Sequence, residues 1–130
     1  MNNYRIVHIL ITTKDYNRLL GHKRNHEKEY SLKLPLTKLC NDCIELTFDM
    51  RISDVLPSLI NREYALAKNS GEETKSVALT LPPDIYQEFK LMKKFIGINI
   101  PLSEIARCFV FKGFDEIVDL ECYDWLTIKY

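Results

Sequence analysis

Two stretches of the chain alternate apolar residues with polar or small ones and then stop at a proline. The first runs from Tyr30 to Pro35 and the second from Val77 to Pro82. A period of two is typical of a strand that buries one face. Proline cannot continue a ladder but is well suited to open a helix. The pattern therefore predicts two short strands, each followed by a helix.

Behind each proline, the apolar residues change to a helical spacing. Apolar side chains at i, i+4, i+7 and i+11 fall on one face of a helix. Gly97 predicts a C-cap for the second of these helices, and residues 49–51 predict a break after the first. The two stripes are Leu39, Cys43, Leu46 and Met50, and Ile85, Phe89, Met92 and Ile96.

A second helix is expected after each of these breaks, and it opens in the same way in both copies. An apolar residue, a serine and an acidic residue follow one another at Ile52-Ser53-Asp54 and at Leu102-Ser103-Glu104. Serine is a favoured N-cap, and an acidic residue suits the positive end of the helix dipole. We expect Ser53 and Ser103 to be the caps, with Pro57 delaying or distorting the first turn behind Ser53.

The repeat predicts a mainly α fold with short β-strands. A five-residue strand needs a partner for its ladder groups, so the two strands are expected to pair as an antiparallel ribbon that packs on four helices. One chain would then form an intramolecular pseudo-dimer. The expected parts are a basic N-terminal extension (1–28), a first motif (29–69), a second motif (75–120) and an apolar C-terminal tail (121–130).

The two terminal parts have patterns of their own. The range 5–13 is rich in β-branched residues and predicts a strand, and Asp15–Leu20 predicts a short helix that stops at Gly21. The tail from Tyr123 to Tyr130 is predicted to be a last strand paired with the first, or a contact between chains.

The order strand, helix, turn, helix over residues 29–118 resembles the ribbon-helix-helix family of DNA-binding regulators (the MetJ/Arc/CopG type), here with two copies in one chain. The resemblance implies that the ribbon enters the major groove of double-stranded DNA and that its outward side chains touch base edges. It also implies that the second helices bind phosphate at their N-termini, at Ser53 and Ser103. Strand alternation then assigns base contacts to Glu29, Ser31, Lys33, Ser76, Ala78 and Thr80.

Charge adds detail to this interpretation. The chain has 18 basic and 18 acidic residues, with a basic beginning and an acidic end. We expect Lys23, Arg24, Lys28 and Lys75 to contact phosphates, the alternative for the first three being a solvated loop. The acidic end would face contacts between chains or the transcription machinery. Net neutrality is unusual for a nucleic-acid binder, so the alternative function is a protein-interaction scaffold on the same fold, such as a viral host-interaction factor.

Candidate chemistry elsewhere in the chain is sparse. Cys40 and Cys43 form a C-x-x-C pair, a spacing known from zinc and redox sites, but they lie in a helical apolar pattern where free cysteine behaves as a small apolar residue. His22 and His26 have a spacing suited to a metal, but their charged neighbours favour an exposed surface. We find no nucleophile–base set and no P-loop, and therefore expect no enzyme, metal or cofactor.

Two further expectations concern location. The chain contains no apolar stretch long enough to span a membrane, and its beginning does not have the pattern of a signal peptide. We therefore expect an intracellular protein without a membrane partner.

Overall fold

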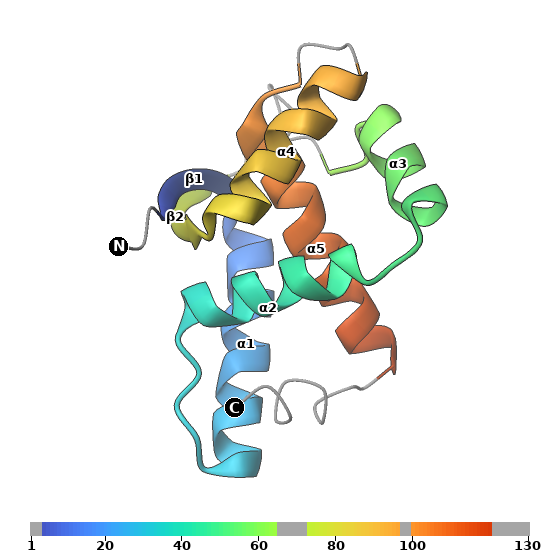
Figure 1. Cartoon of the computed structure of the whole chain (residues 1–130). Coiled ribbons are helices and arrows are strands. Elements are labelled where there is room, and N and C mark those ends of the chain that lie inside the picture. Colours follow the sequence, from blue (N-terminus) through green and yellow to red (C-terminus); the bar gives the residue numbers. More distant parts are fainter. Residues whose placement is uncertain (1–3, 65–72, 97–99, 121–130) are drawn as a thin grey trace.

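The computed structural model describes residues 4–64, 73–96 and 100–120. Its elements follow in the order β1 (Arg5–Thr12), α1 (Thr13–Tyr30), α2 (Leu36–Phe48), α3 (Ile52–Ile60), β2 (Thr74–Leu81), α4 (Pro83–Ile96) and α5 (Leu102–Leu120). Figure 1 shows the two strands together at one edge, with α2 and α5 crossing beside them. The prediction of a mainly α fold with a short two-stranded antiparallel sheet is confirmed.

One chain forms the whole ribbon, but its first strand is not the predicted one. β1 pairs antiparallel with β2, and His8 stands opposite Ala78 near the middle. Tyr30 ends α1, and the residues that follow lead to α2 without forming a strand. The longer β1 run, with its β-branched residues, competes better for β2. In addition, the Glu27 carboxylate accepts the Leu34 N–H at 2.8 Å, which holds this connection to α1.

α1 is one continuous helix, so the predicted stop at Gly21 is wrong. The Thr12 side chain caps its start by accepting the Asp15 N–H at 3.1 Å. Glycine inside a helix costs about 1 kcal/mol relative to alanine. The helix continues because Leu19, His22 and His26 bury one of its faces.

The second predicted motif has the expected elements. β2, α4 and α5 occur in that order, and Phe89 of the α4 stripe is fully buried while the other three stripe residues pack partly buried against the core. The Gly97 C-cap and the tail 121–130 lie outside the described residues.

The predicted range 29–69 does not begin with a strand. The order strand, helix, helix occurs as β1–α1–α2 and again as β2–α4–α5, with α3 as an additional helix between them. Two sets of positions match. Buried Val7, Ile9 and Ile11 correspond to Val77, Leu79 and Leu81, seventy positions later, and Leu34-Pro35-Leu36-Thr37 corresponds to Ile100-Pro101-Leu102-Ser103, sixty-six positions later. The longer α1 accounts for the difference between these two spacings.

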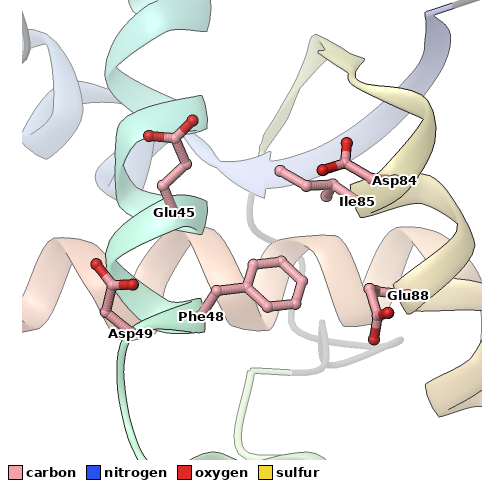
Figure 2. A pocket seen from close by; sticks show the side chains of 6 residues that line it. All are labelled: Glu45, Phe48, Asp49, Asp84, Ile85 and Glu88. Atoms are coloured by element: carbon pink, nitrogen blue, oxygen red, sulfur yellow. The ribbon is translucent and has the colours of Figure 1, made fainter.

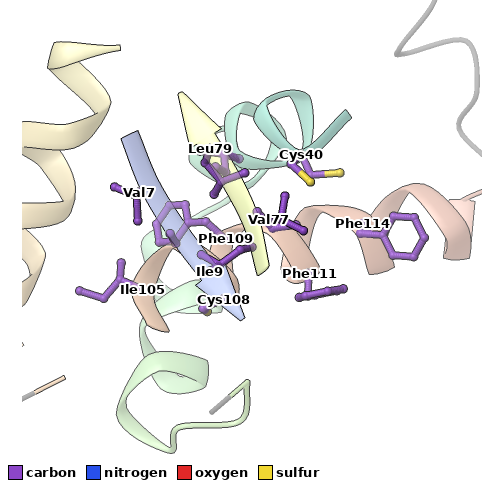
Figure 3. Close-up of a cluster of buried hydrophobic side chains, with 14 of the residues drawn as sticks. Val7, Ile9, Cys40, Val77, Leu79, Ile105, Cys108, Phe109, Phe111 and Phe114 are labelled. Carbon is purple, nitrogen blue, oxygen red and sulfur yellow. The ribbon is translucent and has the colours of Figure 1, made fainter. Parts of the chain in front are cut away.

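The core lies between the inner face of the ribbon and the crossing of α2 with α5, where α5 packs on β1 and α2 packs on β2. Figure 3 shows Ile9, Leu79 and Phe109 meeting there. At the crossing, a Cβ on Gly113 would overlap the backbone carbonyl of Cys43. Thr47, at the position equivalent to Gly113, fills the adjoining space. Its hydroxyl oxygen lies 2.9 Å from the Cys43 carbonyl oxygen and 2.6 Å from that of Phe109.

α3 differs from its prediction at the start. It begins at Ile52 behind the N-cap residue Arg51, so Ser53 lies inside the first turn and is not the cap. Pro57 lies far enough into the helix that the first turn forms ahead of it, and the delayed start is also wrong. None of the helices in the described ranges is both long and apolar enough to cross a membrane.

Candidate nucleic-acid interface

The outer face of the β1–β2 ribbon is a continuous exposed surface. Every second side chain on each strand is exposed, namely Ile6, His8 and Leu10 on β1 and Ser76, Ala78 and Thr80 on β2. The pairing register sets these against each other as Ile6 with Thr80, His8 with Ala78 and Leu10 with Ser76. The face is therefore apolar at both ends of the β1 row and carries hydroxyl groups along the β2 row.

Half of the predicted base-contacting residues lie on this face. Ser76, Ala78 and Thr80 point outward as expected. Glu29, Ser31 and Lys33 do not lie on the ribbon. Glu29 is in the last turn of α1, Ser31 follows it with a left-handed backbone (φ 54°), and Lys33 is in the connection to α2. A helix of 18 residues carries its end about 27 Å from its start, and α1 starts at the ribbon.

The basic residues ahead of the first predicted strand, which were expected to contact phosphate, lie in a helix. Lys23, Arg24 and Lys28 lie in the half of α1 that is remote from the ribbon (Figure 1), and Lys23 Nζ is 3.0 Å from Glu27 Oε1. They do not flank the ribbon, so their position does not support the expected phosphate contacts beside it. Lys75 does lie on β2 and is exposed, and Arg5 of β1 occupies the equivalent place on the other strand.

Two side chains fasten the ribbon to the crossing helices at equivalent points. Asn41 Nδ2 of α2 donates to the Thr80 carbonyl oxygen at 3.2 Å. Arg107 Nε of α5 donates to the Leu10 carbonyl oxygen at 2.7 Å, and its Nη1 donates to that of Tyr64 at 3.2 Å. Asn41 and Arg107 occupy equivalent positions of the internal repeat, and so do their acceptors, Thr80 and Leu10. The strands are therefore held at matched positions on both sides of the ribbon.

The first turn of α2 stands beside one end of the ribbon. Pro35, Thr37 and Lys38 line a hollow of about 330 Å³ together with Tyr4 and Thr80. Thr37 is exposed, and no side chain caps the start of this helix. The first N–H groups of a helix have no intrahelical partners and favour anions. Lys38, which also lines this hollow, forms an ion pair with Asp42, its Nζ lying 3.8 Å from Asp42 Oδ1.

The first turn of α5 has a different charge. Ser103 is the second residue of the helix and therefore lies inside its first turn, which corrects its prediction as the cap. Glu104, the position equivalent to Lys38, is buried and faces Arg62, with Nε–Oε2 and Nη2–Oε1 distances of 3.0 and 2.5 Å. This ion pair raises the pKa of Arg62. Of the two helix entries, the α2 entry is the better suited to bind phosphate.

Cys40 and Cys43 are core residues, as predicted. Cys40, Cys43 and Cys108 are buried and unpaired with one another. Burial raises the pKa of the Cys40 thiol to about 12 and that of Cys108 to about 12, and it raises the pKa of Cys43 as well. Within the described ranges, no group of three or more His, Cys, Asp or Glu residues could hold a metal ion.

His22 and His26 are not on an exposed charged surface, which corrects that expectation. They are 7% and 0% exposed. His22 packs edge-on against Phe114 with ring centroids 5.5 Å apart, and His26 lies 4.9 Å from the ring of Tyr30. Burial, together with the nearby charge of His26, lowers the pKa of His22 to about 4. Burial also lowers the pKa of His26 against the opposing effects of Glu27 and Asp42.

Sequence reasoning predicted the strand over residues 5–13 and the helix behind Pro35, but it did not assign the outward row of β1 or the start of α2 to the site. The available signal was the match between Leu34-Pro35-Leu36-Thr37 and Ile100-Pro101-Leu102-Ser103, which aligns α2 with α5 rather than with α4. That alignment would have placed the first strand upstream of α1. Comparisons of the chain with protein-family models, with curated proteins and with solved structures found no match.

Proposed function

We propose that the chain is a sequence-specific regulator that binds double-stranded DNA through the outer face of its ribbon, on a tandem ribbon-helix-helix architecture. The observation that carries the proposal is the arrangement β1–α1–α2 and β2–α4–α5 around one antiparallel ribbon. The major groove of B-DNA admits a two-stranded ribbon. Here, the exposed rows of both strands are held in register by matched contacts from α2 and α5.

The proposed base contacts come from both strands and are chemically different. Ser76 and Thr80 on β2 donate or accept hydrogen bonds at base edges, and His8 adds a third polar group near the middle. Ile6 and Leu10, 64% and 47% exposed, match the thymine methyl group. Because the two rows differ, one chain prefers an asymmetric DNA sequence. This assignment replaces Glu29, Ser31 and Lys33 with residues of β1.

Phosphate contacts are assigned to the ends of the ribbon. Arg5 and Lys75 occupy equivalent exposed places on the two strands, and the entry of α2 brings Thr37 and Lys38 to one end. Such contacts fix the position of a protein on DNA without reading sequence. Few cations lie near the ribbon, so the salt dependence of binding is expected to be shallow.

The test is selection from a pool of random duplexes, followed by fluorescence anisotropy on the enriched sequence at two salt concentrations. Thr80→Ala should weaken binding to the selected duplex more than to a scrambled one, by about 1–3 kcal/mol for a good base contact. Lys75→Ala should weaken both duplexes equally, since a phosphate contact is insensitive to sequence.

Arg24→Ala is the matched control, because it also removes one exposed positive charge but lies on the remote half of α1. It should leave both affinities unchanged. Equal losses for Lys75→Ala and Arg24→Ala would show attraction by overall charge and contradict a ribbon interface. If no duplex is retained even at low salt, the proposal is wrong.

One observation favours the second candidate function, a protein-interaction scaffold. Tyr4, Ile6 and Leu10 are all large apolar residues at least 47% exposed, and the net charge of the chain is zero. An apolar strand face of this kind suits a protein partner as well as thymine methyl groups. Under this function, His8→Ala and Thr80→Ala would not change the affinity for DNA, and Ile6→Ser would abolish capture of a protein partner.

A further inference from the structure

The C-terminal half of α4 carries an apolar projection. Leu91 and Phe95 are 58% and 78% exposed, and their spacing of four residues places them on one face of the helix. Lys90 and Lys94, both exposed, stand beside them. We call Leu91, Phe95 and these two lysines the α4 knob.

A groove of opposite charge lies between α2 and α4. It has a volume of about 410 Å³ and is lined by Glu45, Phe48, Asp49, Asp84, Ile85 and Glu88. Figure 2 shows Phe48 and Ile85 between carboxylates that approach from both helices. Phe48 is held in place by stacking on Phe89, with ring centroids 5.8 Å apart. We call this the acidic groove.

The knob and the groove are compatible in size and opposite in charge. A phenyl ring of the size of Phe95 fits a groove of this volume and would lie on the apolar floor. The lysines beside it would then approach the exposed carboxylates of the rim. Contacts between exposed charges are weakened by salt, whereas the buried apolar area is not affected in this way.

A chain cannot fill its own groove with its own knob. Glu88 and Phe95 belong to the same helix, and seven residues of helix separate their Cα atoms by about 10 Å along the axis. The rigid helix therefore keeps Phe95 outside the groove that Glu88 lines. A second copy of the chain is the partner that carries the complementary surface.

The internal repeat shows that the fold does not require the knob. The positions of α1 equivalent to Leu91 and Phe95 are Gly21 and Asn25, neither of which is a large apolar residue. The two halves therefore form the same architecture with and without an apolar projection at this place. An exposed apolar pair found in only one half is best explained by a contact with another molecule.

We propose that the α4 knob of one chain docks in the acidic groove of a second copy. Because different surfaces meet, the contact is heterologous. Each end of a dimer retains one unused surface, so larger assemblies form as the concentration rises. The proposal is independent of DNA binding, and its test uses the full chain without DNA.

The experiment is sedimentation velocity over a range of protein concentrations. A knob variant, Leu91→Ser with Phe95→Ser, and a groove variant, Glu45→Lys with Asp84→Lys, should each stay monomeric where the wild type assembles. An equimolar mixture of the two variants should form dimers and nothing larger, since only one intact knob and one intact groove remain per pair. Circular dichroism confirms that each variant is folded.

The control is Glu29→Lys with Asp54→Lys, which reverses two exposed charges that do not line the groove and should assemble like the wild type. A wild type that is monomeric at all concentrations would overturn the proposal. Assembly of the groove variant but not the knob variant would mean that knobs meet knobs, and this outcome also rejects it. Loss of folding stability in the knob variant without any change in assembly would mean that the chain itself covers the knob.

Discussion

The halves β1–α1–α2 and β2–α4–α5 reach the same arrangement with different side chains. The buried strand positions and the Leu/Ile-Pro-Leu entry to the last helix are shared. The inward faces of the middle helices differ, because His22 and His26 on α1 stand where α4 has Met92 and Ile96. The comparison shows that the strand pattern and the helix entry set the frame, while the middle helices tolerate large changes in chemistry.

The same contrast holds at the helix crossing. Gly113 of α5 and Thr47 of α2 are equivalent positions, and they meet where the two helices approach each other most closely. α5 has no side chain at this position, and α2 fills the adjoining space with a hydroxyl group that bonds to backbone. This unequal pair allows two equivalent helices to cross at short distance.

Breaking the crossing should have the largest effect. Gly113→Ala places a methyl group against the Cys43 carbonyl, which is rigid backbone and cannot yield. Overpacking of this kind costs typically 1–3 kcal/mol and occasionally more, so we expect a loss of about 3 kcal/mol in the free energy of unfolding, measured by urea denaturation.

Gly21→Ala is the control for the crossing, because a Cβ there meets nothing within 4 Å. It should stabilise the protein by about 0.5–1 kcal/mol through helix propensity. A similar effect of the two substitutions would show that Gly113 is not at a close approach.

The histidines should make the first half sensitive to acid. The pKa of His22 is lowered to about 4, against about 6.5 in an unfolded chain. Between these values the unfolded state binds more protons, so the free energy of unfolding falls as the pH falls from 6.5 to 4. The loss due to His22 is at most about 3 kcal/mol, and the lowered pKa of His26 acts in the same direction. Urea titrations at several pH values measure it.

Giving α1 the inward residues of α4 sharpens this comparison. His22→Met with His26→Ile should flatten the stability profile between pH 6.5 and 4. An unchanged slope in the double variant would assign the acid sensitivity to other groups.

A smaller effect on the free energy of unfolding is expected from Arg107 and Asn41, the two side chains that hold the ribbon. Arg107 is buried and donates to two carbonyl oxygens, whereas Asn41 is partly exposed and donates to one. Arg107→Met should lower the free energy of unfolding by about 2 kcal/mol and Asn41→Ala by about 1 kcal/mol, because hydrogen bonds from charged groups are the stronger ones. Chemical denaturation of both variants ranks them, and the reverse order would contradict the assignment.

The sequence predicted much of the second half and part of the first. The alternation of β2 and the stripes of α4 and α2 are strong periodic signals, and the side chains lie as they predict. The Tyr30–Pro35 stretch gave the same local signal as β2 but is not a strand, since alternation over five residues does not determine which segment pairs with β2. That choice depends on contacts between distant parts of the chain.

The sequence did not predict α1 as one continuous helix, for a related reason. Its inward face carries two histidines and only one fully buried apolar residue, Leu19, so its pattern resembles a charged surface. Gly21 in addition indicated the end of a helix. The predicted base-contacting residues of β2 lie on the outer face of the ribbon. Those predicted among residues 29–33 do not lie on the ribbon, because this segment is not a strand.

The antiparallel pairing of β1 with β2 joins the two ends of a long chain segment, Arg5 with Leu81 at one end and Thr12 with Thr74 at the other. In a ribbon shared by two separate chains, the strands must first meet by diffusion, and dilution takes them apart. Here the chain between the strands supplies a fixed effective concentration of each strand for the other, at an entropic cost that grows only slowly with its length. The ribbon therefore persists at any dilution of the protein, and its strands cannot be exchanged with those of another molecule without unfolding.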